Sequence, residues 1–398
     1  MPLSSLSGCR VLELGGYLAA PFAGNLLANL GADVIKIEPF SGDPTRFLVG
    51  GGPGGTFVAY SHGKRSICID LTSERGHEVF RRLLATAVVV VHNLAPNSVR
   101  KLRVGAEECR SINAGLVYCH IKGFGRGPRQ DEVASNPIVE AATGVMFGNR
   151  VDGRPTRLGP SYLDMFAGMN AVIGILSELL ARHEGKRPQS LELGLYETAL
   201  HVAARDLFEA RTGCATGNGL PAQREFGIPG YGAYETADGR WIYLLLLSDA
   251  HWVRFCEQLA LPEGADPELA TVRGRRTQAA RVETAIAAAV SGRDFARLAP
   301  VLQSVGIGFT EVRRPNEVFD DPQAQVPGKL IASHYLGRRY EVAAFPDMAP
   351  GSGESVLRSD PPRLGQHTVE ILQSVGYSAA DCHRLVELGA VKAEAADS

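Results

Sequence analysis

The chain has 398 residues, of which 45% are apolar and 21% charged, and its 41 Lys and Arg against 43 Asp and Glu leave a formal net charge of −2. This composition is ordinary for a folded globular protein and excludes disorder for most of the chain. Because no basic run is present, neither a nucleic-acid backbone nor an anionic membrane surface is expected as a partner. The length predicts two or three cores, or one large core interrupted by an inserted domain.

The first half of the sequence predicts an α/β fold. Residues 10–14 predict a short apolar strand, Pro21 suits the first turn of a helix that ends near Leu30, and residues 33–37 predict the next strand. A long apolar helix is predicted at about 165–182. Such alternation is typical of a doubly wound, Rossmann-like parallel sheet with helices on both faces. The other elements predicted in this half are strand 66–69, helix 74–85, strand 88–91, helix 106–113, strand 117–121 and strand 190–193.

The second half predicts a smaller α+β domain inserted between two parts of the large one. Residues 211–225, rich in Gly, Ala, Thr and Asn, predict a linker. Strand-like residues 329–340 are expected to return to the sheet, and the polar tail 392–398 is expected to fray. The predicted parts are therefore 1–210 of the large domain, 211–328 as linker and small domain, and 329–398 as the return to the large domain. The elements predicted in this half are strand 241–246 and helices 251–259, 278–290, 368–375 and 379–388.

No segment of the sequence predicts export or a membrane span. The longest strongly apolar stretches, 87–91 and 241–247, are much shorter than the roughly 20 residues that cross a bilayer. The first eight residues lack the basic and apolar regions of a leader, so we expect a cytoplasmic protein, or one of an organelle matrix if a presequence has been removed. Seven scattered cysteines without a C-x-x-C pair predict reduced thiols, and no metal site is expected.

A parallel sheet first suggests dinucleotide binding, because phosphates bind at a glycine turn before a helix N-terminus. The turn after the first strand, from Gly15 to Pro21, does not fit the G-x-G-x-x-G pattern. The sequence also contains no Walker A loop, no H-E-x-x-H motif and no G-x-S-x-G motif. These absences weaken the case for a nicotinamide enzyme, a nucleotide hydrolase, a zinc hydrolase and a serine hydrolase.

One carboxylate, Asp164, is predicted at the start of the long apolar helix. The free N–H groups and the dipole of a helix N-terminus are expected to hold it ionised, even in an otherwise dry pocket. One interpretation is that Asp164 is the N-cap residue of this helix, a position that aspartate favours. The other is that Asp164 is a nucleophile, able to attack a thioester and carry an acyl group as a mixed anhydride.

Several cationic side chains lie at or near predicted strand ends, where ligands of open α/β sheets usually bind. A solvated surface position explains any one of them. Together they form a candidate binding set for a polyanion such as a nucleotide with a 3′-phosphate and a pyrophosphate. They are Lys36, Lys64, Arg65, Arg100, Lys101 and Lys122.

Short motifs occur in a fixed order along nearly the whole chain. They are 30–38 (LGADVIKIE), 42–43 (GD), 63–66 (GKRS), 70–71 (DL), 93–96 (NLAP), 122–125 (KGFG), 159–168 around Asp164, and 362–368 (PRLGQHT). In their order and spacing these motifs resemble those of the family III (CaiB/BaiF-type) CoA-transferases, a group that includes the related α-methylacyl-CoA racemases.

The resemblance implies a Rossmann-like large domain built from both chain ends, a smaller inserted domain, and a homodimer whose subunits interlock. Coenzyme A would be the shared ligand, bound as an acyl-CoA substrate and not as a tightly held cofactor, with a small carboxylic acid as the second substrate. Asp164 matches the aspartate that attacks the acyl-CoA, forms an aspartyl–CoA thioester and passes CoA to a second acid. Tyr17, Leu18 and Ala19 match a loop whose backbone N–H groups face the oxyanion. The positions that match contacts to CoA are Ile69, Asn93, Leu94, Lys101 and Lys122.

Some residues depart from the family pattern. Leu18 stands where formyl-CoA transferase-like members carry Gln, Pro39 where they carry Arg, and Lys101 where Arg is usual. Oxalate-type specificity is therefore not expected, and a phosphate contact of Lys101 would be a point charge instead of a fork.

Two alternatives to CoA transfer remain open within the resemblance, an acyl-CoA racemase or isomerase and an inactive CoA-binding homologue. Racemases of this group carry a histidine about thirty residues before the aspartate, where this chain has Asn136 and its neighbours. Because Asn136 does not titrate near neutral pH, two-base racemisation has no support in the sequence. Asn136 is interpreted either as a hydrogen-bonding partner of the acyl group or as a turn residue.

Overall fold

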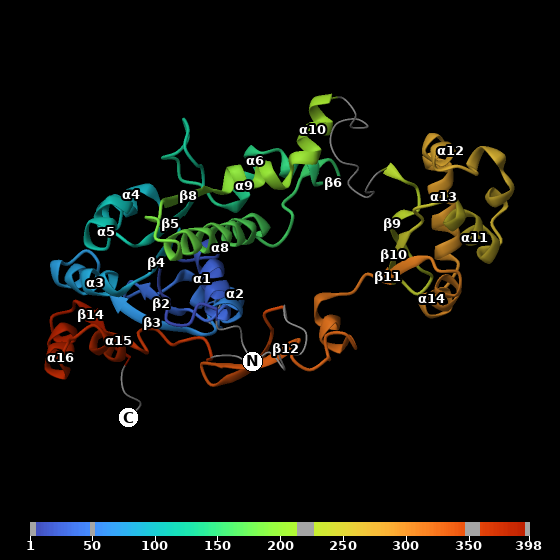
Figure 1. Cartoon of the computed structure of the whole chain (residues 1–398). Coiled ribbons are helices and arrows are strands. Elements are labelled where there is room, and N and C mark those ends of the chain that lie inside the picture. The colour runs from blue at the N-terminus through green and yellow to red at the C-terminus, as the bar shows by residue number, and fades with distance from the viewer. Residues whose placement is uncertain (1–4, 48–51, 213–226, 347–358, 395–398) are drawn as a thin grey trace. The chain divides into compact units, whose positions relative to one another are not determined.

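The computed structural model describes residues 5–47, 52–212, 227–346 and 359–394 of the chain. Two compact units are present, and in chain order the second interrupts the first twice (Figure 1). Most of the predicted linker, 213–225, and the last residues of the predicted tail, 395–398, lie outside the described residues. The first unit comprises Met1–Met146, Arg157–Ala203 and Gln325–Ser398, and the second Phe147–Thr156 and Ala204–Ala324.

The first unit is built on a seven-stranded sheet with the order β14-β3-β2-β1-β4-β5-β8. All strands from β3 to β8 pair in parallel, and β14 pairs antiparallel with β3. From β3 to β8 the order is that of a doubly wound Rossmann sheet. The predicted α/β fold with a parallel sheet is confirmed. The strands are β1 (Arg10–Leu14), β2 (Asp33–Glu38), β3 (Lys64–Ile69), β4 (Val89–His92), β5 (Val117–Lys122), β8 (Ser190–Gly194) and β14 (Val391–Lys392).

Helices cover both faces of this sheet, so most strand side chains on both faces are buried and apolar, with a few buried charged residues among them. Val11 of β1 packs in the core that α1 and α8 close, and Leu12 packs in the core that α3 and α15 close. The helices of this unit are α1 (Ala19–Asn29), α2 (Gly55–Tyr60), α3 (Glu74–Thr86), α4 (Pro96–Leu102), α5 (Ala106–Ile112), α6 (Asn136–Ala142), α8 (Tyr162–His183), α9 (Leu195–Val202), α15 (Thr368–Ser374) and α16 (Ala379–Glu387), and α7 (Val145–Gly148) spans the boundary between the units.

The long apolar helix predicted at about 165–182 is present as α8, Tyr162–His183, and extends slightly beyond the predicted bounds at both ends. It has 22 residues and a mean hydropathy of 1.5 over its most apolar window, so by length and composition alone it could cross a membrane. This helix was not counted among the strongly apolar stretches of the sequence, because isolated polar residues such as Asp164 and Asn170 divide its apolar run. In the structure α8 packs on α1, β5 and β8, as a helix on a sheet does.

The segment after residue 329 does not return directly to the large sheet, as was predicted. It forms a separate hairpin of β12 (Leu330–Tyr335) and β13 (Arg338–Ala343), which packs on Phe57 of α2. The two residues between the strands, Leu336 and Gly337, both have positive φ, which suits a tight hairpin turn. The large sheet is rejoined only at β14, so Lys392, expected in the frayed tail, is paired with Cys68.

The second unit combines an antiparallel sheet, in the order β11-β10-β9, with helices packed around Trp252 and Phe255. The predicted strand near 241–246 and helices near 251–259 and 278–290 lie in this unit. Its elements are β6 (Arg150–Val151), β7 (Arg154–Pro155), α10 (Ala204–Thr212), β9 (Tyr231–Glu235), β10 (Trp241–Leu245), α11 (Asp249–Leu259), α12 (Val272–Thr277), α13 (Ala279–Ser291), α14 (Phe295–Ser304) and β11 (Gly308–Glu311).

Candidate functional site

The strand order of the large sheet reverses between β1 and β4. Loops at the carboxyl ends of the strands flanking such a point form the usual ligand crevice of doubly wound folds. Residues 17–19 follow β1, while Asn93 and Leu94 follow β4. The Asn93 side-chain amide donates to the Gly16 carbonyl at 2.8 Å and thereby joins the two loops. Five of the residues that match family positions are therefore brought together here.

Tyr17 is held in a conformation that aromatic residues rarely adopt. Its φ is +62° and its side chain is 66% exposed. The backbone N–H donates to Asp43 Oδ1 at 3.3 Å, which supports this conformation. Strained residues of this kind cluster at functional sites. The Tyr17 amide itself is already hydrogen-bonded. At the start of α1 the N-cap residue Leu18 has no side chain that could accept from the first amides, so those of Ala19 and Ala20 are the ones that can face an oxyanion.

Below this loop lies a fully buried ion cluster. Lys36 Nζ is 2.8 Å from both Glu13 Oε1 and Asp43 Oδ2, and Lys64 Nζ is 2.7 Å from Glu13 Oε2. The helix α1 approaches the cluster at Gly24, where a Cβ would lie 2.0 Å from the Glu13 carboxylate. Lys36 and Lys64 are 0% exposed, so the expectation that they bind an external polyanion is wrong. In the sequence, the charged residues of β2 and β3 stand beside apolar ones as in a strand with one solvent-exposed face. The sequence pattern therefore did not indicate that Lys36 and Lys64 face inward.

The other predicted cations lie nearer to solvent. Arg65 is engaged by Asp33 at 2.6 Å and by a second acid on α15. Lys122, at the carboxyl end of β5, pairs with Glu192 at 2.9 Å. Lys101 is exposed in the last turn of α4. Two of these candidate cations, Lys101 and Lys122, also belong to the predicted CoA contacts. Lys101 lies on α4, which follows β4, and Lys122 is the last residue of β5.

Ile69 and Leu94 occupy different surroundings. The Ile69 side chain is buried in the core on the α3 side, and its backbone pairs with Val391 of β14. Leu94 is fixed by two histidines, because its N–H donates to His92 Nδ1 and its carbonyl oxygen lies 2.9 Å from His120 Nε2. The structure therefore places Leu94 at the joined loops and Ile69 two strands away from β1 on the other side.

Asp164 is the third residue of α8, whose N-cap is Ser161, so the interpretation of Asp164 as N-cap is wrong. One turn further on, a Cβ at Gly168 would lie 3.0 Å from the Ala19 carbonyl oxygen, so this end of α8 lies beside the start of α1. Burial raises the pKa of Asp164 to about 6, with Arg157 opposing and Glu140 reinforcing the shift. Burial thus outweighs the helix N-terminus that was expected to keep the pKa low, and the carboxylate is still mostly ionised at neutral pH.

Two residues beneath Asp164 were missed or misinterpreted in the sequence. Asn136 Oδ1 accepts hydrogen bonds from the backbone N–H groups of Leu163, at 3.0 Å, and of Asp164, at 3.4 Å. Asn136 is thus neither a turn residue nor placed to bind an acyl group, because it is buried at the start of α6. Its amide donates to Glu140, which is also buried. The signal available was the i, i+4 spacing of two polar residues in an apolar helix.

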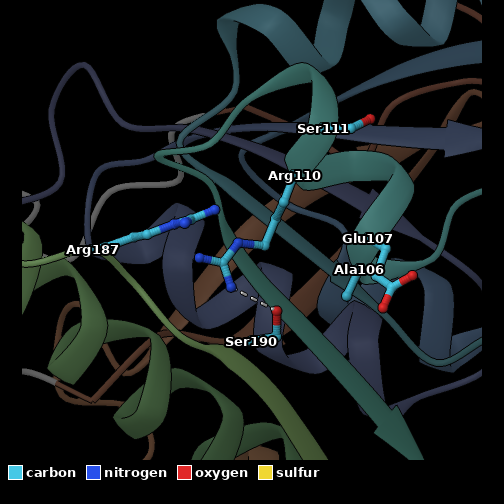
Figure 2. A pocket seen from close by; sticks show the side chains of 6 residues that line it. All are labelled: Ala106, Glu107, Arg110, Ser111, Arg187 and Ser190. Carbon is cyan, nitrogen blue, oxygen red and sulfur yellow. Dashed lines mark hydrogen bonds between the residues drawn. The ribbon is translucent and has the colours of Figure 1, made fainter.

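A separate shallow cavity of about 370 Å³ lies at the other edge of the sheet, near Ser190, which begins β8. Figure 2 shows the side chains of Arg110 and Arg187 pointing toward one another in this cavity. Because the cavity is at the amino end of a strand, it does not belong to the crevice of the switch-point loops. Within the described ranges, no three His, Cys, Asp or Glu side chains gather as a metal site.

Comparisons with known proteins agree on one family. The model of the CoA-transferase family III matches residues 6–368. The succinyl-CoA–D-citramalate CoA-transferase of Chloroflexus aurantiacus is 32% identical over 383 residues, which cover 93% of this chain and 94% of that protein. The succinate–glutarate CoA-transferase of Agrobacterium fabrum is 30% identical over 392 residues, covering 92% and 94%.

A solved structure leads to the same family. A CaiB/BaiF family protein from Brucella suis superposes with a TM-score of 0.83 at 26% identity, covering 94% of this chain and all of that one. Sequence and structure thus agree over almost the full length. The chain belongs to CoA-transferase family III.

Proposed function

We propose that this protein is an acyl-CoA:carboxylic acid CoA-transferase that works through covalent intermediates on Asp164. The observation that carries the proposal is the half-buried carboxylate of Asp164 in the first turn of α8, beside the start of α1. The two relatives described above are named for succinyl-CoA with D-citramalate and for succinate with glutarate. Short carboxylic acids are therefore the acceptor class that we propose.

The reaction is a sequence of acyl substitutions that needs no oxidant and no net proton. An Asp164 oxygen attacks the thioester carbonyl carbon and the C–S bond breaks, which releases CoA as the thiolate and leaves the acyl group on Asp164 as a mixed anhydride. The thiolate then attacks the aspartyl carbonyl carbon, which releases the first carboxylate and leaves an aspartyl–CoA thioester. The acceptor carboxylate then attacks the aspartyl–CoA thioester, which releases CoA thiolate and forms a second mixed anhydride. The thiolate attacks the acceptor's carbonyl carbon in this anhydride, so that the new acyl-CoA is released and the Asp164 carboxylate is regenerated.

The loops at the switch point supply the other groups that the reaction needs. The uncapped amides at the start of α1, including that of Ala19, are the proposed donors to each tetrahedral oxyanion. The proposed CoA contacts are Tyr17, Leu18, Asn93, Leu94 and Ile69, with Lys101 and Lys122 for the phosphates. Lys122 would have to share its charge between a phosphate and Glu192.

Two-base racemisation has less support than transfer. A racemase needs a second acid or base facing the α-carbon opposite the first. Asn136 has no useful titration near neutral pH, and Glu140, the other carboxylate near Asp164, is fully buried behind it and receives two hydrogen bonds. Solvent deuterium exchange at the α-carbon of an acyl-CoA, without any acceptor acid, is the result that would favour a racemase over a transferase.

Trapping the intermediate tests the proposal directly. The protein is incubated with succinyl-CoA and quenched with hydroxylamine, which converts a carboxyl anhydride or thioester into a hydroxamate. Peptide mass spectrometry is expected to find the hydroxamate at Asp164, and only when acyl-CoA was present. CoA transfer to added glutarate or citramalate without any modified Asp164 would contradict the mechanism, and binding of CoA without transfer to any acid of a broad panel would indicate an inactive homologue.

We also propose that the two units act as a large domain and a smaller inserted domain of an interlocked, cytoplasmic homodimer. One face of α8 supports the pairing, because Ile173 is 66% and Leu180 61% exposed there. A contiguous apolar helix face of this kind is typical of an interface. Light scattering in solution is expected to give about twice the 42.5 kDa of one chain. A monomer at micromolar concentration would contradict this part of the proposal.

A further inference from the structure

The N-terminus of α8 is capped from another helix. The first amides of a helix are usually satisfied by the side chain of the N-cap residue. Here the N-cap residue Ser161 supplies no such bond, and the acceptor for the amides of Leu163 and Asp164 is Asn136 Oδ1, at the start of α6. The backbone that carries the proposed nucleophile is thus held by a side chain 28 residues earlier in the chain.

Glu140 determines which way the Asn136 amide faces. It lies one turn after Asn136 on α6, is 0% exposed, and accepts the Asn136 Nδ2–H group through Oε1. Its other oxygen accepts from the backbone N–H of Leu158, at 3.2 Å, just before α8. Because a carboxylate is only an acceptor, it binds the NH2 end of the Asn136 amide and turns the oxygen toward α8.

Glu140 is also a fully buried carboxylate that accepts two hydrogen bonds, one through each oxygen. Such burial is costly, and a neutral residue of similar shape would be expected to fit this position at a lower cost. A carboxylate in this position therefore points to a role that a neutral side chain would not fill.

We propose that Asn136 and Glu140 form a pair of positioning residues for Asp164, in which Asn136 caps α8 beneath the nucleophile and Glu140 orients that cap. The proposal rests on the proposed function of Asp164. Neither residue touches substrate, because both are buried.

The negative charge of Glu140 has a second effect on the same site. It opposes the ionisation of Asp164 and so adds to the effect of burial on the pKa of that carboxyl, whereas Arg157 acts in the opposite direction. Two other helices, α1 and α9, pack against α8 and could bring charge near Asp164. The helix α1 carries no charged side chain, and Glu197 of α9 accepts a hydrogen bond from the Gly125 N–H. A carboxylate of higher pKa is a stronger nucleophile as long as it is ionised at the working pH.

A pair of variants separates this role from simple packing. Glu140→Gln removes the charge and leaves a side-chain amide that cannot accept from both Asn136 and Leu158. The double variant Asn136→Asp with Glu140→Gln exchanges the two functional groups, so that an aspartate accepts from the α8 amides while the glutamine donates to it and accepts from Leu158. The exchange keeps the charge and every hydrogen bond. Glu107→Gln, at an exposed position on α5, is the matched control.

The first readout does not depend on activity. Carboxyl modification of Asp164 by a water-soluble carbodiimide and glycine ethyl ester, followed across pH by peptide mass spectrometry, reports its protonation. The wild-type midpoint is expected near pH 6. Glu140→Gln is expected to lower the midpoint by about half a unit, while the exchanged pair and Glu107→Gln keep it near the wild-type value.

The second readout is turnover with succinyl-CoA. Glu140→Gln is expected to lower kcat roughly tenfold with KM for the acyl-CoA within about twofold, and the exchanged pair is expected to recover kcat to within about threefold. A Glu140→Gln variant with wild-type midpoint and kcat, or an exchanged pair that stays as impaired as the single variant, would overturn the proposal. Another outcome is that the midpoint differs between the wild-type protein and Glu140→Gln as expected, while the wild-type protein shows no CoA transfer and no hydroxamate. In that case the proposed function fails instead.

Discussion

Replacing Asp164 by alanine is expected to lower CoA-transfer turnover by about a thousandfold or more while CoA binding is retained. The reason is that Asp164 carries each covalent intermediate, so without its oxygen the acyl and CoA groups have no shared acceptor on the protein. The proposed CoA contacts lie on the loops after β1 and β4, at the end of β3, and on α4 and β5, which the substitution leaves in place. Steady-state assay with succinyl-CoA and an acceptor acid, together with calorimetry of CoA binding, measures both quantities.

A matched control for this variant exists on another helix. Asp381 is also the third residue of its helix, α16, where it forms a capping box with Ser378. Asp381→Ala is expected to weaken that helix end and to leave turnover unchanged. If Asp164→Ala kept wild-type turnover, the covalent mechanism would be wrong, and if both variants lost activity together, the loss would have to be assigned to folding.

Replacing Lys36 by methionine is expected to lower the free energy of unfolding of the first unit by about 3–5 kcal/mol. Lys36 is fully buried and is 2.8 Å from both Glu13 and Asp43. Without it, two buried carboxylates face one another with Lys64 as the remaining cation of the cluster. Urea denaturation followed by circular dichroism measures the change, whereas tryptophan fluorescence reports the second unit, which contains Trp241 and Trp252, and is expected to keep its midpoint.

Lys122→Met is the matched control for this loss of charge, because Lys122 also pairs with one glutamate but near solvent. A pair at the surface contributes about 0–1 kcal/mol, so a small change is expected. Equal losses in the two variants would contradict the assignment of the buried cluster as a stabilising unit. The Asp43 end of the cluster also holds the Tyr17 amide, so Lys36→Met is expected to loosen the β1 loop as well.

The sheet was predictable from the sequence because its strands are short apolar runs that alternate with amphipathic helices. The helix α3, for example, was expected at 74–85 and is found at Glu74–Thr86. The hairpin of β12 and β13 was mistaken for one element because only two residues, Leu336 and Gly337, separate its two strand-like segments. The antiparallel β14 is two residues long, and such a segment has no periodicity to detect.

Part of the candidate site was predictable as well. The loops after β1 and β4 meet because the order of the strands places them at the same edge, which an alternating pattern already implies. The inward-facing charges were not predictable, because Lys36 and Lys64 differ from surface lysines only in what the other strands place against them. Asn136 was equally obscure, since its partner helix begins 26 residues later.

The short strand β14 has a consequence for the solution behaviour of the protein. It covers β3, which among the described strands would otherwise be the outermost strand of the parallel sheet on that side. An uncovered edge of this kind exposes unpaired N–H and C=O groups and can template pairing with a second chain. Two residues, Val391 and Lys392, thus protect the Cys68–Ile69 end of this edge against pairing with a second chain, and the charge of Lys392 adds to that protection.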